Sequence, residues 1–183
     1  MIEARDMCVI ETSPVVETRR LLLRAPAPQD IPAIARLAND HDIARMTKRM
    51  PHPFGQGDAE DFVIAVAAQN PARANTFVIE HEDHGVVGVL GMFEDEDRVP
   101  EAGYWIGREF WGRGLATEAL EGALVWASKR WKRRALVAGH FADNPASGRV
   151  LEKAGFLYTG ETRRAFSRAR KADIDTRMMV WLA

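Results

Sequence analysis

The feature that most constrains the fold is a change of periodicity in the middle of the chain. Apolar residues follow period two in NTFVIEH (75–81) and VVGVLGMF (86–93), and the tetrapeptide EDHG separates the two runs. A short connection that ends in glycine predicts a β-hairpin. A third strand is expected at EAGYWIG (101–107), followed by a helix and the strand RALVAGHF (134–141). Antiparallel strands followed by one β-α-β crossover predict an α/β domain with a mixed, mostly antiparallel sheet.

Helices with period 3.6 are predicted before and after these strands. Asp30 is the expected N-cap of the first helix, since Pro32 is tolerated in a first helical turn. The closing segments FLYTGET (156–162) and TRMMVWLA (176–183) are predicted as strands around a polar loop. The expected order of elements is therefore β-α-α-α-β-β-β-α-β-α-β-β.

The size and composition of the chain are typical of one soluble globular domain. It has 183 residues, of which 46% are hydrophobic and 28% charged, and single domains usually hold roughly 100–200 residues. We expect a leader over residues 1–15 and one domain over 16–183. The net charge of −1 argues against general binding of polyanions, so a nucleic-acid partner is not expected.

The cellular location is predicted to be the cytoplasm. Cys8 is the only cysteine, which rules out an internal disulfide and suits a reducing compartment. No apolar run approaches the roughly 20 residues of a membrane helix. The first residues are partly acidic and contain no apolar signal region, so a signal peptide is not predicted.

A glycine-rich turn at FWGRGLATEA (110–119) marks a candidate ligand site. A strand, a glycine turn and a helix N-terminus together favour an anion, because the first helical N–H groups lack intrahelical partners. Arg113 and the Thr117 hydroxyl can add contacts to a phosphate. The alternative is a glycine turn that only starts a helix. A Walker loop and a dinucleotide fingerprint both fit this segment poorly, since the Gly-Lys-Ser/Thr sequence and the third glycine are missing.

The segment WGRGLA (111–116) resembles the pyrophosphate loop of the GNAT N-acetyltransferase superfamily, which binds acetyl-coenzyme A. Trp111 departs from the Gln/Arg of the family pattern, but it is usual in the branch that acetylates ribosomal-protein N-termini. ETRRLLLRAPAPQD, GYWIGREFWGRGLATEA and DNPASGRVLEKAGF resemble that branch in the same order along the chain. The resemblance spans residues 16–183 and implies a single-domain GNAT fold with a splayed central strand pair, 101–107 and 134–141.

The resemblance also implies the residues that contact acetyl-coenzyme A. The pantetheine arm would enter between the splayed strands and pair with backbone amides, and one such amide would polarise the thioester carbonyl. The alternative is that Trp105 and Ile106, on the first of these strands, are simply part of the strand core. The predicted cofactor-binding residues are Trp105, Ile106, Trp111, Gly112, Arg113, Gly114, Leu115, Ala116, Thr117 and Asn144.

Two residues are candidates for proton transfer. Glu101 begins the strand before the glycine loop and can take a proton from an incoming amine, although it can also be a simple strand-start charge. Ser147 can donate a proton to the leaving thiolate. Asn144 and Ser147 form the Asn-x-x-Ser motif of the branch, and Asn144 before Pro145 is also an ordinary helix cap.

Other polar features favour structural roles. His140 ends a strand near the predicted site and can act as a base, but a satisfied structural histidine is the preferred interpretation. No metal is predicted, because the histidines show no metal-ligand spacing with each other or with Cys8. The basic run TRRAFSRARK (162–171) is interpreted as a solvated loop, with an acidic partner or RNA as the alternative. The loop PHPFGQG (51–57) is a candidate substrate lid.

The predicted function is transfer of acetyl from acetyl-coenzyme A to a primary amine by direct attack. The preferred acceptor is the α-amino group of a protein or peptide, and the chain would be a monomer or homodimer without membrane contact. A small amine, such as an antibiotic or polyamine, is the alternative acceptor, with the acidic run 94–101 as its candidate binding site. A non-catalytic acyl-CoA-binding module is the alternative from a different class.

Overall fold

The structure is a computed structural model, and it describes residues 14–94 and 99–183. The predicted leader therefore lies outside the described residues except for Pro14 and Val15. The strands are β1 (Val16–Glu17), β2 (Leu21–Arg24), β3 (Ala74–His81), β4 (Gly85–Glu94), β5 (Pro100–Ile106), β6 (Ala135–Phe141), β7 (Leu157–Ser167) and β8 (Ala172–Leu182). The α-helices are α1 (Ile31–Ala38), α2 (His41–Ala44), α3 (Gln56–Ala67), α4 (Leu115–Lys129) and α5 (Pro145–Lys153), with 3-10 turns at Pro28–Asp30 and Arg108–Phe110.

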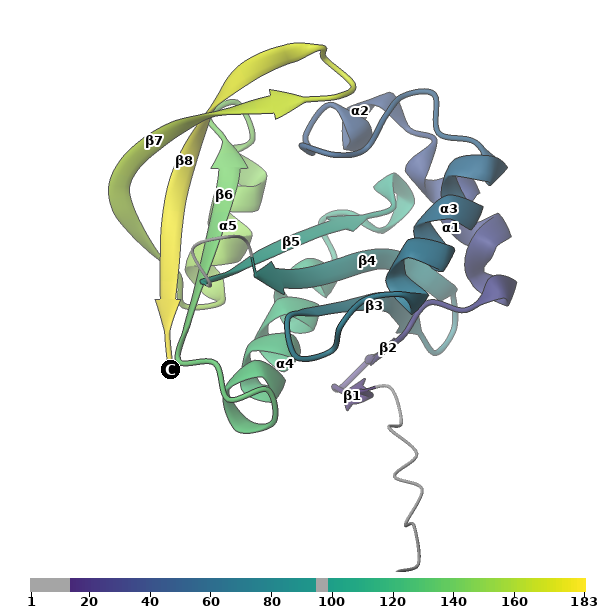
Figure 1. The fold of residues 1–183 in the computed structure, drawn as a ribbon, viewed down its shortest axis with the longest axis horizontal. Helices are drawn as coiled ribbons and strands as arrows, with labels where there is room; N and C mark the ends of the chain where they lie inside the picture. Colours follow the sequence, from purple (N-terminus) through teal and green to yellow (C-terminus); the bar gives the residue numbers. More distant parts are fainter. Residues whose placement is uncertain (1–13, 95–98) are drawn as a thin grey trace, which may run out of the picture.

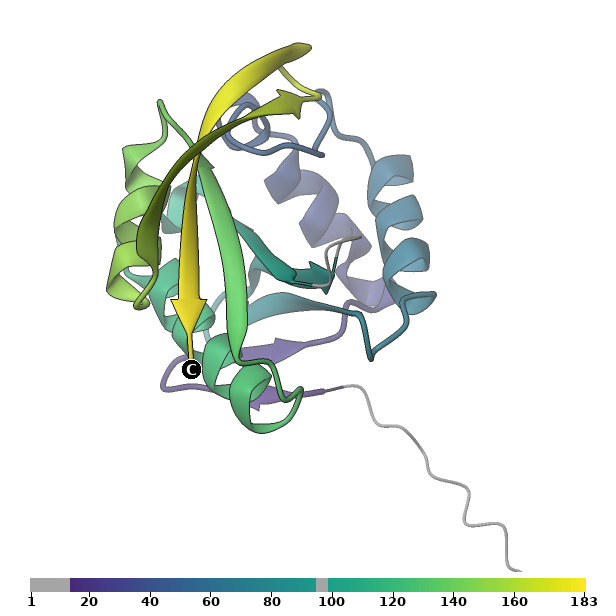
Figure 2. The same ribbon diagram turned by 60° about the vertical axis from the view of Figure 1, so that its left-hand side comes forward.

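The strands of the described residues form one sheet in the order β1-β2-β3-β4-β5-β6-β8-β7 (Figures 1 and 2). Only β5 and β6 run parallel, while every other neighbouring pair is antiparallel. This arrangement confirms the predicted mixed, mostly antiparallel sheet. It also confirms the order of helices and strands, apart from the short additional strand β1.

Helices cover both faces of the sheet (Figure 2). Helix α1 packs against α3 and β4, whereas α4 packs against β1, β2 and β5. The core between these layers contains fully buried side chains from both the strands and the helices. Examples are Leu23, Ile34, Phe77, Leu90, Leu120 and Leu136.

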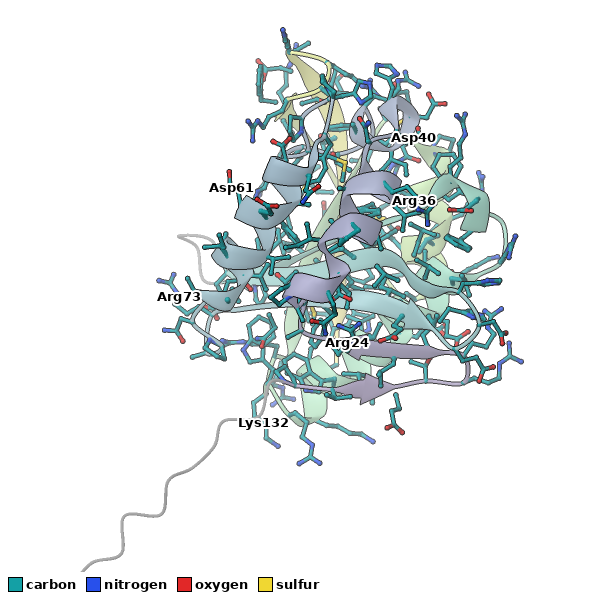
Figure 3. All side chains as sticks on the ribbon, turned by 90° about the vertical axis from the view of Figure 1, so that its right-hand side faces the viewer. Arg24, Arg36, Asp40, Asp61, Arg73 and Lys132 are labelled. Atoms are coloured by element: carbon teal, nitrogen blue, oxygen red, sulfur yellow. The ribbon has the colours of Figure 1, made fainter. Side chains whose placement is uncertain are left out.

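Asp30 precedes α1 as predicted, but its side chain does not cap that helix. The carboxylate instead accepts hydrogen bonds from the Arg24 guanidinium at 2.7 and 2.9 Å and from the backbone N–H of Ala27. Arg24 is labelled in Figure 3. Burial alone would raise the pKa of Asp30, but the hydrogen bonds from Arg24 and Ala27 bring it below the usual value. The expectation that the Asp30 side chain caps α1 was wrong, because Arg24 on β2 binds the same carboxylate.

The interpretation of residues 162–171 as a solvated loop was also wrong. Strand β7 continues to Ser167 and pairs with β8 through Ser167 and Ala172, so that only residues 168–171 form the turn. The pairing holds these polar residues in a strand although most of their side chains are exposed.

In the candidate lid, residues 51–57, the Phe54 side chain is buried. The backbone N–H of Phe54 donates to Asn39 Oδ1 at 3.0 Å, which anchors the loop. Within the described part of the chain, no helix combines the length and apolar character needed to cross a membrane.

Candidate active site

The central strands β5 and β6 separate after a very short parallel ladder. Glu101 pairs with Val137 and Ala102 pairs with Ala138, and the ladder ends there. Residues 103–106 then remain paired with β4 on one side only, while 139–141 remain paired with β8. The edges of the two strands that face each other beyond Ala102 can therefore accept an extended ligand as an added strand. Trp105 and Ile106 lie on this diverging part of β5.

The glycine loop between β5 and α4 requires glycine for its backbone conformation. Gly112 and Gly114 have φ angles of 74° and 75°, in the left-handed region where side chains other than glycine are strained. A Cβ at Gly112 would meet no atom within 4 Å, so the loop is open on that side. The first helical hydrogen bond runs from Glu118 N to Gly114 O, which leaves the N–H groups of Leu115, Ala116 and Thr117 without intrahelical acceptors.

The side chains of the glycine loop differ in their exposure to solvent. Trp111 is half exposed, and its indole N–H donates to Ile106 O at 2.7 Å, which folds the loop back on the end of β5. Arg113 is exposed, whereas Leu115 is buried in the core. Leu115 can therefore contribute only its backbone to a ligand.

A cleft of about 870 Å³ lies beside the loop, between residues 15–19 and α4. Gly114 and Thr117 line one part of it, and Lys129, Arg130 and Lys153 line another. Glu17, Glu118 and Glu121 also line the cleft, so its charge is mixed and it favours an anion only at the cationic part.

Glu118 fixes the start of α4 to the β1–β2 turn. Its carboxylate accepts hydrogen bonds from the Thr18 hydroxyl and from the backbone and side chain of Arg20, at 2.7–2.8 Å. Burial alone would raise the pKa of Glu118, but these bonds bring it below the usual value. The sequence did not reveal this contact, which places the glycine loop on a rigid support.

Tyr104 and Ser147 connect β5 to α5 across the gap between the diverging strands. Their side-chain oxygens lie 2.9 Å apart, and the Tyr104 hydroxyl also lies 3.2 Å from Ser147 O. Burial raises the pKa of Tyr104 to about 12, so its hydroxyl is neutral near pH 7. Asn144 Oδ1 accepts the N–H of Ser147 at 3.2 Å, as expected for a helix N-cap. Tyr104 was not predicted as a site residue.

Glu101 forms an ion pair with Lys48, which the sequence did not predict. The Lys48 ammonium donates to Glu101 Oε1, and the two side chains are 33% and 21% exposed. The carboxylate is thus partly accessible at the point where β5 and β6 begin to separate.

Glu94, the first residue of the acidic run, has an 8% exposed side chain and pairs with Arg133 at 2.6 Å and Arg73 at 3.5 Å. Residues 95–98 of that run lie outside the described residues.

His140 has the contacts of a structural residue. It is 4% exposed, and its Nδ1 and Nε2 lie 2.9 Å from Phe141 O and 3.0 Å from the Tyr158 hydroxyl. Because both ring nitrogens have partners, the preferred structural interpretation agrees with the geometry. Gly148 lies against this pair, where a Cβ would come within 2.9 Å of the imidazole.

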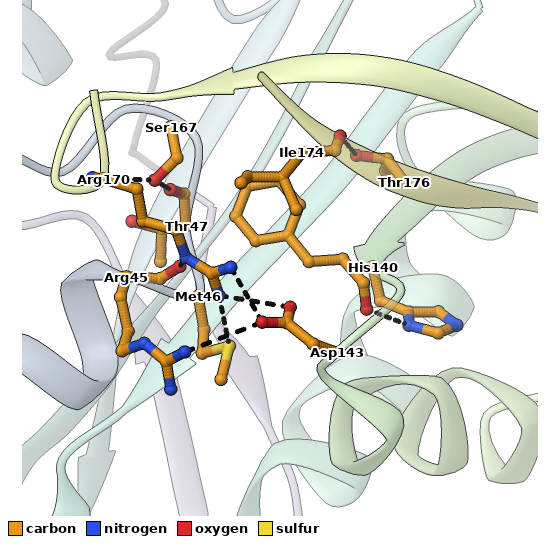
Figure 4. Close-up of polar contacts among 10 residues, drawn as sticks. Arg45, Met46, Thr47, His140, Asp143, Ser167, Arg170, Ile174 and Thr176 are labelled. Carbon is orange, nitrogen blue, oxygen red and sulfur yellow. Dashed lines mark hydrogen bonds and ion pairs between the residues drawn. The ribbon is translucent and has the colours of Figure 1, made fainter. Parts of the chain in front are cut away.

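The turn between β7 and β8 is fastened to the segment that follows α2 (Figure 4). The Arg170 guanidinium binds both carboxylate oxygens of Asp143, at 2.8 and 3.1 Å, and donates to Arg45 O at 2.6 Å. Ser167 Oγ donates to Thr47 O at 3.2 Å. The hydrogen bonds from Arg170 hold the pKa of Asp143 below its usual value. These contacts fix the backbone that leads into Lys48.

No group of three or more metal-binding side chains occurs within residues 14–94 and 99–183. The remaining polar groups suit acyl transfer. The site combines a glycine loop whose first helical N–H groups lack intrahelical acceptors, two diverging strands, and a carboxylate near the point where these strands separate.

Comparison with known proteins agrees with this chemistry. The family model "Acetyltransferase (GNAT) domain" matches residues 20–157, and the chain belongs to this family. An uncharacterized N-acetyltransferase of Bacillus subtilis, YoaA, is 28% identical over 160 residues, which are 82% of this chain and 86% of that protein.

Two solved structures illustrate the range of relatives. The first is the Salmonella typhimurium acetyl transferase that modifies the N-terminal serine of ribosomal protein L7/L12. It has a TM-score of 0.79 and 19% identity, covering 93% of this chain and 99% of that one. The second is a Vibrio cholerae spermidine N-acetyltransferase with CoA and spermine, with a TM-score of 0.74 and 22% identity, covering 89% and 95%. The similarity to ribosomal-protein acetyltransferases is confirmed, and the protein is an acetyl-CoA-dependent N-acetyltransferase.

Proposed function

We propose that this acetyltransferase modifies the α-amino group of a protein or peptide. The supporting observation is that Glu94 and Glu101, at the two ends of the acidic run, both have cationic partners. Glu94 is enclosed by Arg133 and Arg73, and Glu101 already has Lys48 as a partner. A polycation needs several accessible carboxylates, whereas a single amine needs one proton acceptor. The pairing of Glu94 and Glu101 therefore favours a single amine.

The donor is proposed to lie along the glycine loop and between the diverging strands. The N–H groups of Leu115, Ala116 and Thr117 would bind its pyrophosphate, which Gly112 and Gly114 allow to approach closely. The backbone of Trp105 and Ile106 would pair with the pantetheine arm, and a strand N–H would polarise the thioester carbonyl. Acetyl-CoA, when bound, supplies an activated acetyl group.

Glu101 is proposed to remove the proton from the acceptor amine. The amine nitrogen forms a bond to the acetyl carbonyl carbon, the carbon–sulfur bond breaks, and the released thiolate takes a proton. Ser147, hydrogen-bonded to neutral Tyr104, can deliver that proton. An α-amino group has a pKa of about 7.7–8.0, against about 10.4 for lysine. A larger fraction of it is thus neutral near pH 7, so that one carboxylate suffices as a base.

A panel of acceptors tests this proposal. Peptides that begin with Ala or Ser, spermidine and an aminoglycoside would each be incubated with acetyl-CoA and the full chain, and kcat/KM compared. We expect the highest value for a peptide, with acetylation on its α-amino group by mass spectrometry. A much higher kcat/KM for spermidine or the aminoglycoside would refute the peptide acceptor and support the small-amine alternative.

A further inference from the structure

Cations that have no carboxylate partner among the described residues lie on the β7–β8 turn and on the segment after α2 that pairs with Glu101. The turn 168–171 lies against the segment 45–49, since Arg168 N donates to Lys48 O at 3.1 Å and Arg170 Nε donates to Arg45 O. Figures 1 and 2 show this turn beside α2, at the end of the molecule opposite β1. We refer to Arg49, Arg168 and Lys171 as the basic rim.

The basic rim is close to the carboxylate that is proposed to receive the acceptor amine. Lys48, the neighbour of Arg49, bonds directly to Glu101. The Arg49 guanidinium lies 4.2 Å from the centre of the Phe93 ring, and Phe93 is the β4 residue that pairs with Glu101. An acceptor with its amine at Glu101 would therefore lie beside Lys48 and Arg49.

Among the described residues, the carboxylates nearest the rim are paired with other cations. Asp143 binds Arg170 and Arg45, and Glu101 binds Lys48. Among residues 14–94 and 99–183, no carboxylate forms an ion pair with Arg49, Arg168 or Lys171, and all three side chains are exposed.

The acidic residues that follow the turn on β8 are Asp173 and Asp175. Asp173 pairs with Phe166 and Asp175 with Arg164 across the β7–β8 ladder, so both lie further along the hairpin than the turn residues. Arg164 also donates to Asp173 O at 2.9 Å. In the turn itself and in segment 45–49, the described residues carry only basic charges.

We infer that the acceptor is an acidic peptide segment, with Asp or Glu side chains a few residues after the amine that is acetylated. This inference rests on the proposed function, because it assumes that the amine binds at Glu101. An extended chain advances about 3.3 Å per residue, so residues three to six of a peptide would lie about 7–17 Å from its amine. Acidic side chains there would meet the rim, whereas a basic segment would be repelled.

Three peptides with the same first two residues test this inference. Positions three to six would contain Asp and Glu, Ser and Gln, or Lys. Exposed charge pairs contribute about 1.5- to 5-fold each, so two or three of them predict about tenfold higher kcat/KM for the acidic peptide than for the neutral one. The preference should decline between 50 and 500 mM NaCl, because salt screens exposed charges.

A double variant and a matched control separate the rim from general charge effects. Arg49→Gln with Arg168→Gln should remove most of the preference for the acidic peptide. Lys132→Gln with Arg134→Gln removes the same charge elsewhere and should preserve the preference. Lys132 and Arg134 line a separate small cleft, and Lys132 lies far from α2 and its N-cap Asp40 in Figure 3. Thermal unfolding and CoA binding would verify that both variants remain folded.

The outcomes distinguish this inference from the proposed function. Equal kcat/KM for acidic and neutral peptides would overturn the inference while leaving a peptide acceptor in place. Spermidine acetylation without any peptide acetylation would overturn both. A single-stranded RNA oligonucleotide would be added as a competitor. Tight RNA binding that depends on Arg49 and Arg168, together with equal peptide rates, would identify the rim as a nucleic-acid contact and refute the inference.

Discussion

Replacement of Gly112 by alanine should weaken coenzyme A binding much more than an equally strained replacement elsewhere. Gly112 has φ of 74°, and a Cβ there would meet no protein atom within 4 Å. The cost of the left-handed conformation for alanine is about 1–2 kcal/mol, which corresponds to roughly 2–4 °C in Tm per kcal/mol for a chain of this size. Any additional effect on binding must come from the ligand that approaches the loop.

The effect on binding can be estimated from the hydrogen bonds that the new methyl group would disturb. A hydrogen bond to a charged group contributes about 1.5–3 kcal/mol, so the loss of one phosphate contact predicts a Kd about 10- to 150-fold higher. Isothermal titration calorimetry with coenzyme A measures this change, and a thermal melt measures the change in stability.

Gly85 provides the matched control. It has φ of 65°, a Cβ there would also meet no atom within 4 Å, and it lies in the β3–β4 hairpin. Gly85→Ala should lower Tm about as much as Gly112→Ala but leave the Kd for coenzyme A unchanged. Equal Kd values for wild type and Gly112→Ala would refute the assignment of the loop as the pyrophosphate site.

Three further predictions concern proton transfer and stability. Glu101→Gln should lower kcat about 100-fold and flatten the acidic limb of the pH–rate profile, and an unchanged profile would exclude Glu101 as the base. Ser147→Ala should lower kcat about tenfold, less than a typical general acid because a thiolate leaves readily; full activity would exclude its role. Asp30→Asn should lower the free energy of unfolding at pH 7 by about 2 kcal/mol, because it breaks the buried pair with Arg24. The folded-state pKa of Asp30 is depressed, so its contribution is present above the unfolded value of about 3.9 and is lost at lower pH. Urea unfolding at pH 7 and pH 3 should show a smaller deficit at pH 3, and an equal deficit would contradict this reasoning.

The fold was largely predictable because its signals are local. Alternation in 75–81 and 86–93 reflects strands that alternate their side chains between two faces, and a glycine marks the turn between them. The glycine loop was equally recognisable, since a positive φ at Gly112 and Gly114 excludes most other residues. These features depend only on near neighbours in the sequence.

Strand β7 shows where local signals fail. Ten of its eleven residues are at least partly exposed and only Ser167 is buried, so buried and exposed residues do not alternate along this strand. Its conformation depends on pairing with β8 rather than on burial of one face. The sequence TRRAFSRARK therefore gave no periodic signal, and a polar loop was the expected but incorrect interpretation.

The side-chain contacts of the candidate site depend on the tertiary structure. Tyr104 and Ser147 are 43 residues apart, and Lys48 and Glu101 are 53 apart. No spacing rule joins such pairs, because the distance between them is set by the crossover from β5 to β6 and by the position of α2. The sequence predicted Glu101 and Ser147 individually as candidates for proton transfer, but it did not predict the residue that each one contacts.

The Glu101 end of the site is best understood as the meeting point of three segments that are far apart in the chain. Segment 45–49 carries Lys48, strand β5 carries Glu101, and the β7–β8 turn holds segment 45–49 through Ser167 and Arg170. Arg170 contacts neither Glu101 nor the glycine loop, yet its bonds to Asp143 and Arg45 fix the backbone that presents Lys48. Because the turn both fixes this backbone and carries two of the rim cations, changes in the hairpin would alter acceptor preference without altering the glycine loop if the acceptor binds as proposed. In the proposed site, the donor side and the acceptor side are thus supported by different elements of the fold.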